Sequence, residues 1–206
     1  MEKTSIGLEK HPQAPQSFLK KVDKYRISEL IAQGGMASIF IAKDNNCRRK
    51  VALKVMQNAG SQKDDIIHRF IEEAQIAAQL DHPNILPVYD LTVDAQGNPF
   101  YAMKLVDGLT LEEVFCKLKE KDPETVQAYP LSRLLQVFIK ICDALSFAVD
   151  KNVIHRDLKP ENIMIGPFGE VFVMDWGIAK VINNNNTSIH KSDADATEVI
   201  ERLRMN

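Results

Sequence analysis

The sequence predicts an α+β protein of two lobes, a β-rich first lobe that contains one helix and a second lobe that is mainly helical. Three observations support this class: short strand-like runs fill the first half, one periodic helix interrupts them, and amphipathic helical patterns open the second half. The 206 residues suffice for one large domain or two small lobes. We expect a flexible leader at 1–23, a first lobe at 24–106, a second lobe at 107–180 and a tail at 181–206.

Three strand-like runs open the first lobe. They cover residues 25–31, 38–42 and 50–55. The QGGM sequence between the first two runs indicates a tight turn. Because side chains alternate along a strand, Ala52 and Lys54 share one face of the third run. The apolar residues on its other face are Val51, Leu53 and Val55.

A helix is predicted at 64–80, because apolar side chains recur there with the helical period. The apolar stripe comprises Ile66, Ile67, Phe70, Ile71, Ala74, Ala77 and Ala78. Pro83 and Pro87 bracket the start of a further strand, and DAQGN at 94–98 indicates a hairpin turn. That turn leads into a strand at 100–105.

The second lobe begins with a capping-box spacing at Thr110 and Glu113, which predicts a helix that ends near Lys119. After a loop at DPET, a long amphipathic helix is predicted at 131–149. Its apolar stripe comprises Leu131, Leu134, Leu135, Phe138, Cys142, Leu145 and Val149. The two short strands that follow cover 163–165 and 171–174. From Val181 onward the chain is hydrophilic, although its last residues have a helical tendency.

Composition excludes several classes of protein. The net charge of −2 gives no reason to expect nucleic acid or an anionic membrane as a partner. Cys47, Cys116 and Cys142 lie far apart and form neither a disulfide framework nor a metal cluster. No apolar run is long enough to span a bilayer, and the first residues lack the apolar stretch of a signal peptide. We therefore expect a cytoplasmic protein without a membrane segment.

The most informative stretch is HRDLKPEN at 155–162, which MDWG follows at 174–177. The two motifs bring an acid, a cation, an amide and a second acid into a short span: Asp157, Lys159, Asn162 and Asp175. These groups are the ones that transfer a phosphoryl group from a metal-bound nucleotide to a hydroxyl. With the motifs upstream of them, they make the chain resemble the eukaryotic-type protein kinases over residues 25–180. It is most similar to bacterial serine/threonine protein kinases of the DWG type.

This resemblance implies a two-lobed protein kinase-like fold with a β-rich N-lobe and an incomplete helical C-lobe. It also implies ATP-dependent transfer of the γ-phosphate to serine or threonine hydroxyls of a protein substrate, with ATP and Mg²⁺ as cofactors. By the resemblance, Asp157 would accept or orient the hydroxyl proton, and Lys159 would neutralise charge on the transferring phosphate. Asn162 and Asp175 would hold magnesium.

The turn between the first two strands resembles the glycine-rich loop that covers the nucleotide phosphates. Its implied nucleotide-binding residues are Ile31, Ala32, Gln33, Gly34, Gly35, Met36, Ala37, Ser38 and Ile39. Of the three glycine positions of the family pattern, only Gly34 is a glycine, whereas the outer two are Ala32 and Ala37. We expect the two alanines to stiffen the loop, because alanine has less backbone freedom than glycine.

The resemblance also identifies the phosphate-contacting lysine and the adenine pocket. Lys54 in VALK would reach the α- and β-phosphates and pair with a helix glutamate. Glu73 and Glu72 are the two candidates for that glutamate, and the RFxxEA register favours Glu73. The implied adenine pocket consists of Ala52, Met103 at its back, the Lys104 carbonyl, the Val106 backbone and Met164.

The family pattern continues beyond DWG to an A-P-E motif and further helices, which this sequence does not contain. We interpret the chain as a truncated reading frame, a fragment or one half of a split gene, with low stability or self-association through the incomplete C-lobe. The alternative function is a truncated or pseudokinase-like module that binds nucleotide or a partner without turnover, which the two loop alanines favour. A small-molecule kinase of related fold is the third candidate, and KPEN and DWGIAK argue against it.

Overall fold

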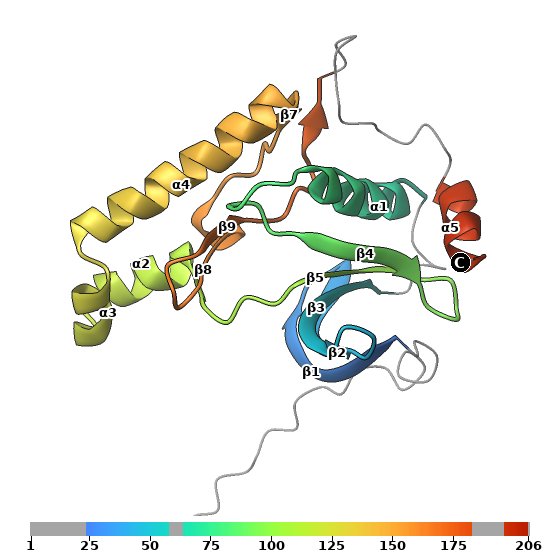
Figure 1. The fold of residues 1–206 in the computed structure, drawn as a ribbon, viewed down its shortest axis with the longest axis horizontal. Coiled ribbons are helices and arrows are strands. Elements are labelled where there is room, and N and C mark those ends of the chain that lie inside the picture. The colour runs from blue at the N-terminus through green and yellow to red at the C-terminus, as the bar shows by residue number, and fades with distance from the viewer. Residues whose placement is uncertain (1–23, 58–63, 183–195, 206) are drawn as a thin grey trace, which may run out of the picture.

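A computed structural model describes residues 24–57, 64–182 and 196–205, and it has the predicted two-lobed α+β architecture (Figure 1). The predicted leader at 1–23 and residues 183–195 of the predicted tail lie outside the described residues. The first lobe is an antiparallel sheet in the order β1-β2-β3-β5-β4, against which helix α1 packs. Its elements are β1 (Tyr25–Gln33), β2 (Ala37–Asp44), β3 (Arg49–Met56), α1 (Asp64–Gln79), β4 (Val88–Val93) and β5 (Pro99–Lys104).

The side chains on the two faces of β3 pack in different apolar clusters. Val51, Leu53 and Val55 pack on the side of the sheet that faces away from α1, together with Phe100. Ala52 packs on the other side, in the cluster that contains the apolar face of α1. The alternation predicted from the sequence is therefore confirmed, and it turns Lys54 toward α1 as well.

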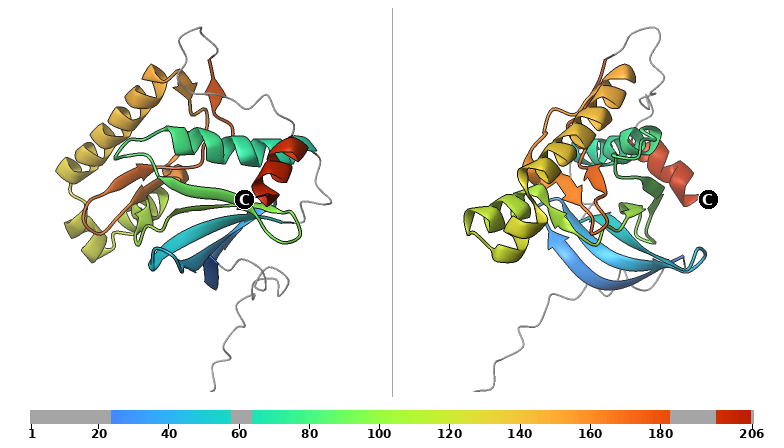
Figure 2. Two further views of the ribbon diagram at one scale, coloured as in Figure 1. Left: turned by 45° about the vertical axis from the view of Figure 1, so that its right-hand side comes forward. Right: turned by 60° about the vertical axis from the view of Figure 1, so that its left-hand side comes forward.

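The edge strands β1 and β4 approach each other, although three strands separate them in the sheet order. Asp90 Oδ2 accepts a hydrogen bond from Lys24 Nζ at 2.6 Å and another from the Tyr25 hydroxyl at 2.9 Å. The sheet is therefore strongly curled, as Figure 2 shows. Burial and the hydrogen bond to Asp90 raise the pKa of Tyr25 to about 12, so its phenol remains a donor at neutral pH.

Helix α5 (Ala196–Arg204) packs against α1 and β4 on the outer side of the first lobe (Figure 2). Val199 is buried in the same apolar cluster as α1, and Ile200 and Leu203 lie partly buried against that cluster. The Arg204 guanidinium lies over Gly97 in the β4–β5 turn, where a Cβ would come within 1.9 Å of it. The helical tendency of the last residues is confirmed. Their contact with the first lobe was not foreseen from the sequence.

The second lobe contains three helices among the described residues, together with two small sheets. The helices are α2 (Leu111–Lys119), α3 (Pro123–Ala128) and α4 (Leu131–Asp150), with a short 3₁₀ turn, η3, at Pro160–Asn162. One sheet consists of β6 (Leu109–Thr110), β8 (Ile163–Ile165) and β9 (Val171–Val173), and the other pairs β7 (Val153–Ile154) with β10 (Lys180–Val181). The predicted capping box is confirmed, because Glu113 N donates to Thr110 Oγ1 at 3.1 Å and Thr110 N donates to Glu113 Oε2 at 2.7 Å.

The predicted loop at DPET is wrong, since this segment begins helix α3. Asp122 caps the helix by accepting a hydrogen bond from Thr125 N at 2.8 Å. Pro123 occupies the first turn, where its missing N–H leaves no intrahelical bond unmade. The sequence contained both of these helix-start signals, but the helix is so short that no apolar period accompanies them.

Helix α4 buries a different face from the stripe that the sequence analysis identified. Its buried residues are Val137, Ile141, Ala144 and Ala148. The predicted stripe points outward for most of its length, with Leu131 72%, Leu135 53% and Phe138 62% exposed. We call Leu131, Leu135, Phe138, Cys142 and Val149 the outer stripe of α4.

Two hydrogen bonds link the segment after α1 to β9 of the second lobe. Val173 N donates to the Asn84 carbonyl at 2.8 Å, and Leu86 N donates to the Val173 carbonyl at 3.0 Å. Because DWG directly follows β9, this link places Asp175 beside α1 and β3. The motif residues of the two lobes thereby meet at one cleft.

Candidate active site

A cavity of about 550 Å³ lies beneath the β1–β2 turn and is lined by both lobes. Lys54, Glu73, Asp157 and Asp175 all face it. The predicted loop residues that line it are Ala32, Gln33, Gly34, Gly35, Met36, Ala37 and Ile39. The turn closes through a hydrogen bond from Gly34 N to the Ala37 carbonyl at 2.9 Å. A Cβ on Gly34 would lie 3.3 Å from that carbonyl oxygen, so this position is tight for any larger residue.

Two of the predicted loop residues are not brought into this cavity. Ser38 alternates with Ala37 and Ile39 along β2, so it faces the other side of the strand. Its side chain is buried there and accepts a hydrogen bond from Gln57. Ile31 is 49% exposed on β1. Any contact of Ser38 with a nucleotide would therefore involve its backbone.

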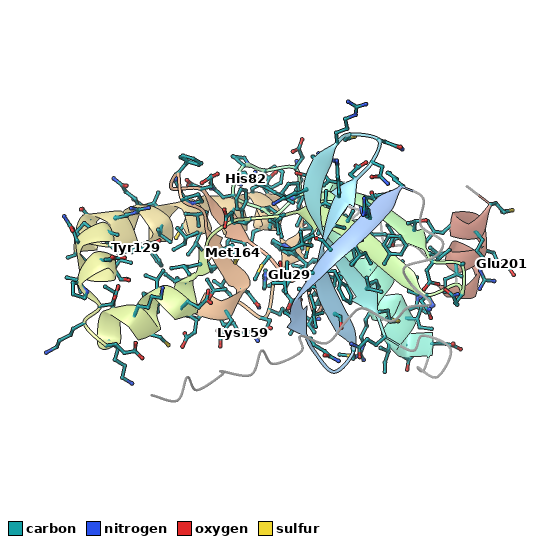
Figure 3. The ribbon with its side chains drawn as sticks, turned by 90° about the horizontal axis from the view of Figure 1, so that it is seen from below. Glu29, His82, Tyr129, Lys159, Met164 and Glu201 are labelled. Carbon is teal, nitrogen blue, oxygen red and sulfur yellow. The ribbon has the colours of Figure 1, made fainter. Side chains whose placement is uncertain are left out.

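The residues of the predicted adenine pocket lie together in one apolar cluster. Ala52 and Met103 are cross-strand partners on β3 and β5, and Val106 and Met164 pack against the same cluster. Figure 3 shows Met164 between the helices of the second lobe and the sheet of the first. A smaller cavity of about 80 Å³ continues behind Met103.

The Lys104 side chain packs against a member of the same cluster. Its ammonium lies 5.2 Å from the ring centroid of Phe172, in a cation–π arrangement. Its backbone N–H donates to the Pro87 carbonyl at 3.1 Å. The adenine contact predicted for the Lys104 carbonyl stays a prediction.

Lys54 and Glu73 form a partly buried ion pair on the cavity wall. Lys54 Nζ lies 2.5 Å from Glu73 Oε1 and 3.9 Å from Asp175 Oδ1. Glu73 is 7% exposed because the period of α1 turns it toward the sheet. The same Oε1 atom also accepts a hydrogen bond from the Tyr101 hydroxyl at 2.6 Å. Of the two candidate glutamates, Glu73 is therefore the one that pairs with Lys54.

Asp157 lies at the centre of a second polar cluster. Lys159 Nζ lies 3.0 Å from Asp157 Oδ2, and Asn162 Nδ2 donates to the Asp157 carbonyl at 2.8 Å and to Oδ2 at 3.2 Å. The hydrogen bond and charge of Lys159 lower the pKa of Asp157 below its ordinary value. Asp157 is therefore an ionised acceptor at neutral pH.

His155 connects the two motifs through both of its ring nitrogens. Nδ1 accepts a hydrogen bond from Asp157 N at 3.2 Å, and Nε2 lies 3.0 Å from the Met174 carbonyl. An acceptor on one nitrogen and a carbonyl facing the other require a neutral ring that is protonated on Nε2. Trp176 packs against the imidazole in a tilted arrangement, with a centroid distance of 4.6 Å. His155 thus holds the Asp157 and Asp175 segments in register.

The stability of the chain should fall as the pH drops below about 6.5, because burial lowers the pKa of His155 from that ordinary value. A histidine with a lowered folded-state pKa takes up its proton more readily when unfolded. Its stabilising contribution is therefore complete above the unfolded pKa and is lost as the pH falls toward the folded pKa. Denaturant unfolding between about pH 5 and pH 8 measures this loss. His155→Gln should flatten the profile, and a variant that keeps the full wild-type slope would contradict the assignment.

The backbone is strained at both motifs. Arg156 has a φ of 67° and Asp175 a φ of 64°, in the left-handed region that residues with a Cβ seldom adopt. Arg156 Nε donates to the Ile178 carbonyl at 2.6 Å, which holds the segment after DWG against the HRD segment. A Cβ on Gly177 would lie 3.3 Å from both Asp175 Oδ1 and Glu73 Oε2, so a larger residue would fit tightly between the two carboxylates.

Sequence reasoning missed two residues of this site. His155 was given no role beyond its place at the start of HRDLKPEN, although it contacts both motifs. Tyr101 was given no role within the predicted strand at 100–105, although its hydroxyl contacts Glu73. Tyr101 and Met103 share one face of β5 by strand alternation, and that signal could have indicated that Tyr101 faces α1.

Comparison with known proteins identifies the class. The protein kinase domain pattern matches residues 25–202, so the chain belongs to the protein kinase family. The serine/threonine-protein kinase PknD of Protochlamydia amoebophila is 41% identical over 167 residues, which are 79% of this chain and 17% of that protein. PknD of Chlamydia trachomatis serovar D is 35% identical over 184 residues, which are 88% of this chain and 20% of that protein. PknD of Chlamydia muridarum is 37% identical over 161 residues.

These relatives confirm the predicted resemblance to bacterial serine/threonine kinases. The chain spans no more than a fifth of the length of these relatives, at 17% to 20%. Among the described residues, no helix combines the length and the apolar composition that crossing a membrane requires.

Proposed function

We propose that the chain transfers the γ-phosphate of ATP to serine or threonine hydroxyls of a protein substrate. The observation that carries this proposal is the convergence of Lys54, Glu73, Asp157 and Asp175 on one cavity beneath the β1–β2 turn. Its volume of about 550 Å³ lies within the range of small-molecule and cofactor sites. Its charged side chains are suited to phosphates. Of the predicted adenine-pocket residues, Met103 lines the smaller cavity, which shares Lys54, Glu73 and Asp175 with the larger one, whereas Ala52 and Met164 line neither.

The nucleotide would lie with its adenine against Ala52, Met103 and Met164 and its hydrogen-bonding edge at the backbone of Lys104 and Val106. The β1–β2 turn would face its phosphates at Gly35, whose backbone N–H has no side-chain cover, whereas the Gly34 N–H already donates to the Ala37 carbonyl. Lys54 would contact the α- and β-phosphates, while Glu73 fixes the position of its ammonium.

Asp157 would accept or orient the proton of the attacking hydroxyl, since its carboxylate is ionised and faces the cavity. Lys159, in contact with Asp157, would neutralise charge on the transferring phosphate. The donor set fits Mg²⁺, which prefers carboxylate and amide oxygens: the Asp175 carboxylate and Asn162 Oδ1, whose Nδ2 is directed toward Asp157. When bound, the ion would offset the negative charge of the phosphates.

The alternative, a module that binds nucleotide or a partner without turnover, is not favoured. The relatives are serine/threonine-protein kinases, and the acid, amide and lysine positions of the catalytic pattern all carry the required residue types. The alanines at 32 and 37 leave the turn formed and lining the cavity.

The wild-type chain should be stabilised against thermal unfolding by ATP with magnesium and should then label a generic basic protein with the terminal phosphate. Lys54→Met should weaken the thermal shift, because it removes the ammonium that would contact the phosphates. Among the described residues, this ammonium is the only side-chain cation within 4 Å of Glu73. Adenosine, which lacks phosphates, serves as the control ligand and should bind both forms equally. Equal ATP stabilisation of the two forms would contradict the assigned role of Lys54.

We also propose that two copies of the chain associate through the outer stripe of α4. The stripe follows a spacing of four, three, four and seven residues and carries no charged side chain, which suits a helix-on-helix seam. Arg133 and Lys140 lie in the first half of α4, and Asp143 and Asp150 lie in the second half. An antiparallel pair would set the basic half of each helix against the acidic half of the other.

We place the chain in the cytoplasm, as the sequence analysis expected. The three cysteines, Cys47, Cys116 and Cys142, are all free and exposed, as is usual in a reducing compartment.

A further inference from the structure

The hydroxyl of Tyr101 is hydrogen-bonded to Glu73, the acidic member of the Lys54–Glu73 ion pair. Tyr101 lies on β5, two residues before Met103, so both side chains point from the same face of the strand toward α1. The hydroxyl donates to Glu73 Oε1 at 2.6 Å, and Lys54 Nζ lies 2.5 Å from the same oxygen. One carboxylate oxygen therefore receives a neutral donor from β5 and a charged donor from β3.

The Tyr101 side chain is almost fully buried, at 4% exposed. Its ring packs against Phe70 of α1 with a centroid distance of 5.3 Å, and the Lys54 ammonium lies 5.7 Å from the ring centroid. Burial and the neighbouring charge of Glu73 raise the pKa of Tyr101 well above its ordinary value. The phenol therefore remains protonated, and a donor, over the whole physiological pH range.

Because both donors bond to Glu73, the hydrogen bond of Tyr101 and the ion pair of Lys54 both depend on the position of Glu73. If α1 moved so that Glu73 left Lys54, the Tyr101 hydroxyl would stay in an apolar cluster without this acceptor. The desolvation penalty of an unpaired buried donor exceeds the net stabilisation that its hydrogen bond provides. Tyr101 therefore penalises states of the chain in which α1 has moved outward, whereas Lys54, which is partly exposed, can turn to solvent.

We propose that Tyr101 is a positioning residue that holds Glu73 in place and, through Glu73, sets the direction of the Lys54 ammonium. This inference rests on the proposed function of Lys54 as the lysine that contacts the nucleotide phosphates. The residue acts on the phosphate end of the site and leaves the adenine end unaffected, because Met103 and Ala52 do not depend on Glu73 for their position.

Tyr101→Phe is the direct test, because it removes only the hydroxyl and keeps the ring against Phe70. In the presence of magnesium, the affinity of this variant for ATP should fall about five- to tenfold, which corresponds to the net contribution of one buried hydrogen bond. Its affinity for adenosine should stay within about twofold of wild type. Tyr25→Phe is the matched control: it also removes a buried hydroxyl that is bonded to a carboxylate, Asp90, but it lies away from the cavity. The control should bind both ligands as wild type does.

Two results would overturn the inference. The first is an unchanged ATP affinity in Tyr101→Phe. The second is an equal loss for ATP and adenosine, which would indicate a general structural effect. In a Lys54→Met background, Tyr101→Phe should produce no further loss of ATP affinity, because the group through which Tyr101 acts is absent.

A measurement without nucleotide separates this inference from the proposed function. The free energies of unfolding of wild type, Tyr101→Phe, Glu73→Met and the double variant form a double-mutant cycle. Tyr101→Phe should destabilise the wild-type chain more than it destabilises Glu73→Met. Additive effects would refute the contact even if the chain binds ATP. If coupling is present but neither wild type nor Lys54→Met responds to ATP, the positioning contact stands and the proposed function fails.

Discussion

Asp157→Asn is expected to reduce phosphate transfer to a protein substrate at least about a hundredfold while leaving ATP affinity within about twofold of wild type. An amide at this position cannot take up the proton of the attacking hydroxyl. The carboxylate is ionised in the wild-type chain, since Lys159 lowers its pKa. Its removal therefore eliminates a group that is in the correct protonation state at neutral pH.

The fold should tolerate this substitution. The stronger hydrogen bond from Asn162 goes to the Asp157 backbone carbonyl, at 2.8 Å, and does not involve the side chain that is changed. The ion pair with Lys159 is largely exposed, and pairs of that kind contribute little to stability. Transfer is measured by the initial rate of labelling of a basic protein at saturating ATP, and binding by the magnesium-dependent thermal shift.

Asp81→Asn is the matched control, because it makes the same chemical change at an exposed aspartate of the segment between α1 and β4. It should transfer phosphate at the wild-type rate. If Asp157→Asn retained more than about a tenth of the wild-type rate, Asp157 would not be the group that handles the proton. If it also lost ATP binding, the substitution would have disturbed the cavity, and the rate would have to be compared at equal nucleotide occupancy.

The second large effect is expected at the outer stripe of α4. Leu135→Glu combined with Phe138→Glu should convert a self-associated chain into a monomer at micromolar concentration. Burial of each apolar side chain contributes about 1.5–3 kcal/mol to association. Both copies lose both side chains, so the dissociation constant should rise by at least about two to four orders of magnitude. Both side chains are mostly exposed in the single chain, so their replacement should leave its fold intact.

Sedimentation equilibrium measures this change directly. A suitable control is Gln127→Glu combined with Gln136→Glu, which adds two carboxylates at exposed positions of α3 and α4 without removing apolar surface. The control should associate as the wild type does. A wild-type chain that stays monomeric throughout the micromolar range would show that the stripe does not bind a second copy.

Local patterns in the sequence determined much of this protein. The period-2 alternation on β3, the capping box at Thr110 and Glu113, and the order of VALK, HRDLKPEN and DWG all concern residues close together in the chain. Backbone geometry fixes how such residues lie relative to one another, whatever the rest of the fold does. The family and its reaction class followed from these motifs.

Only the tertiary structure decided which surfaces and polar groups meet. Helix α4 has two apolar faces, and the one with the smaller side chains, including Ala144 and Ala148, is buried because it fits closely against the strands of the second lobe. Tyr101 lies 28 positions from Glu73 in the chain, and His155 lies 19 from Met174. No local period encodes such contacts, because they depend on how α1, β5 and the two motif loops pack against one another. The sequence could therefore predict the acid, the lysine and the candidate metal ligands, whereas long-range packing alone determined what holds these residues in place.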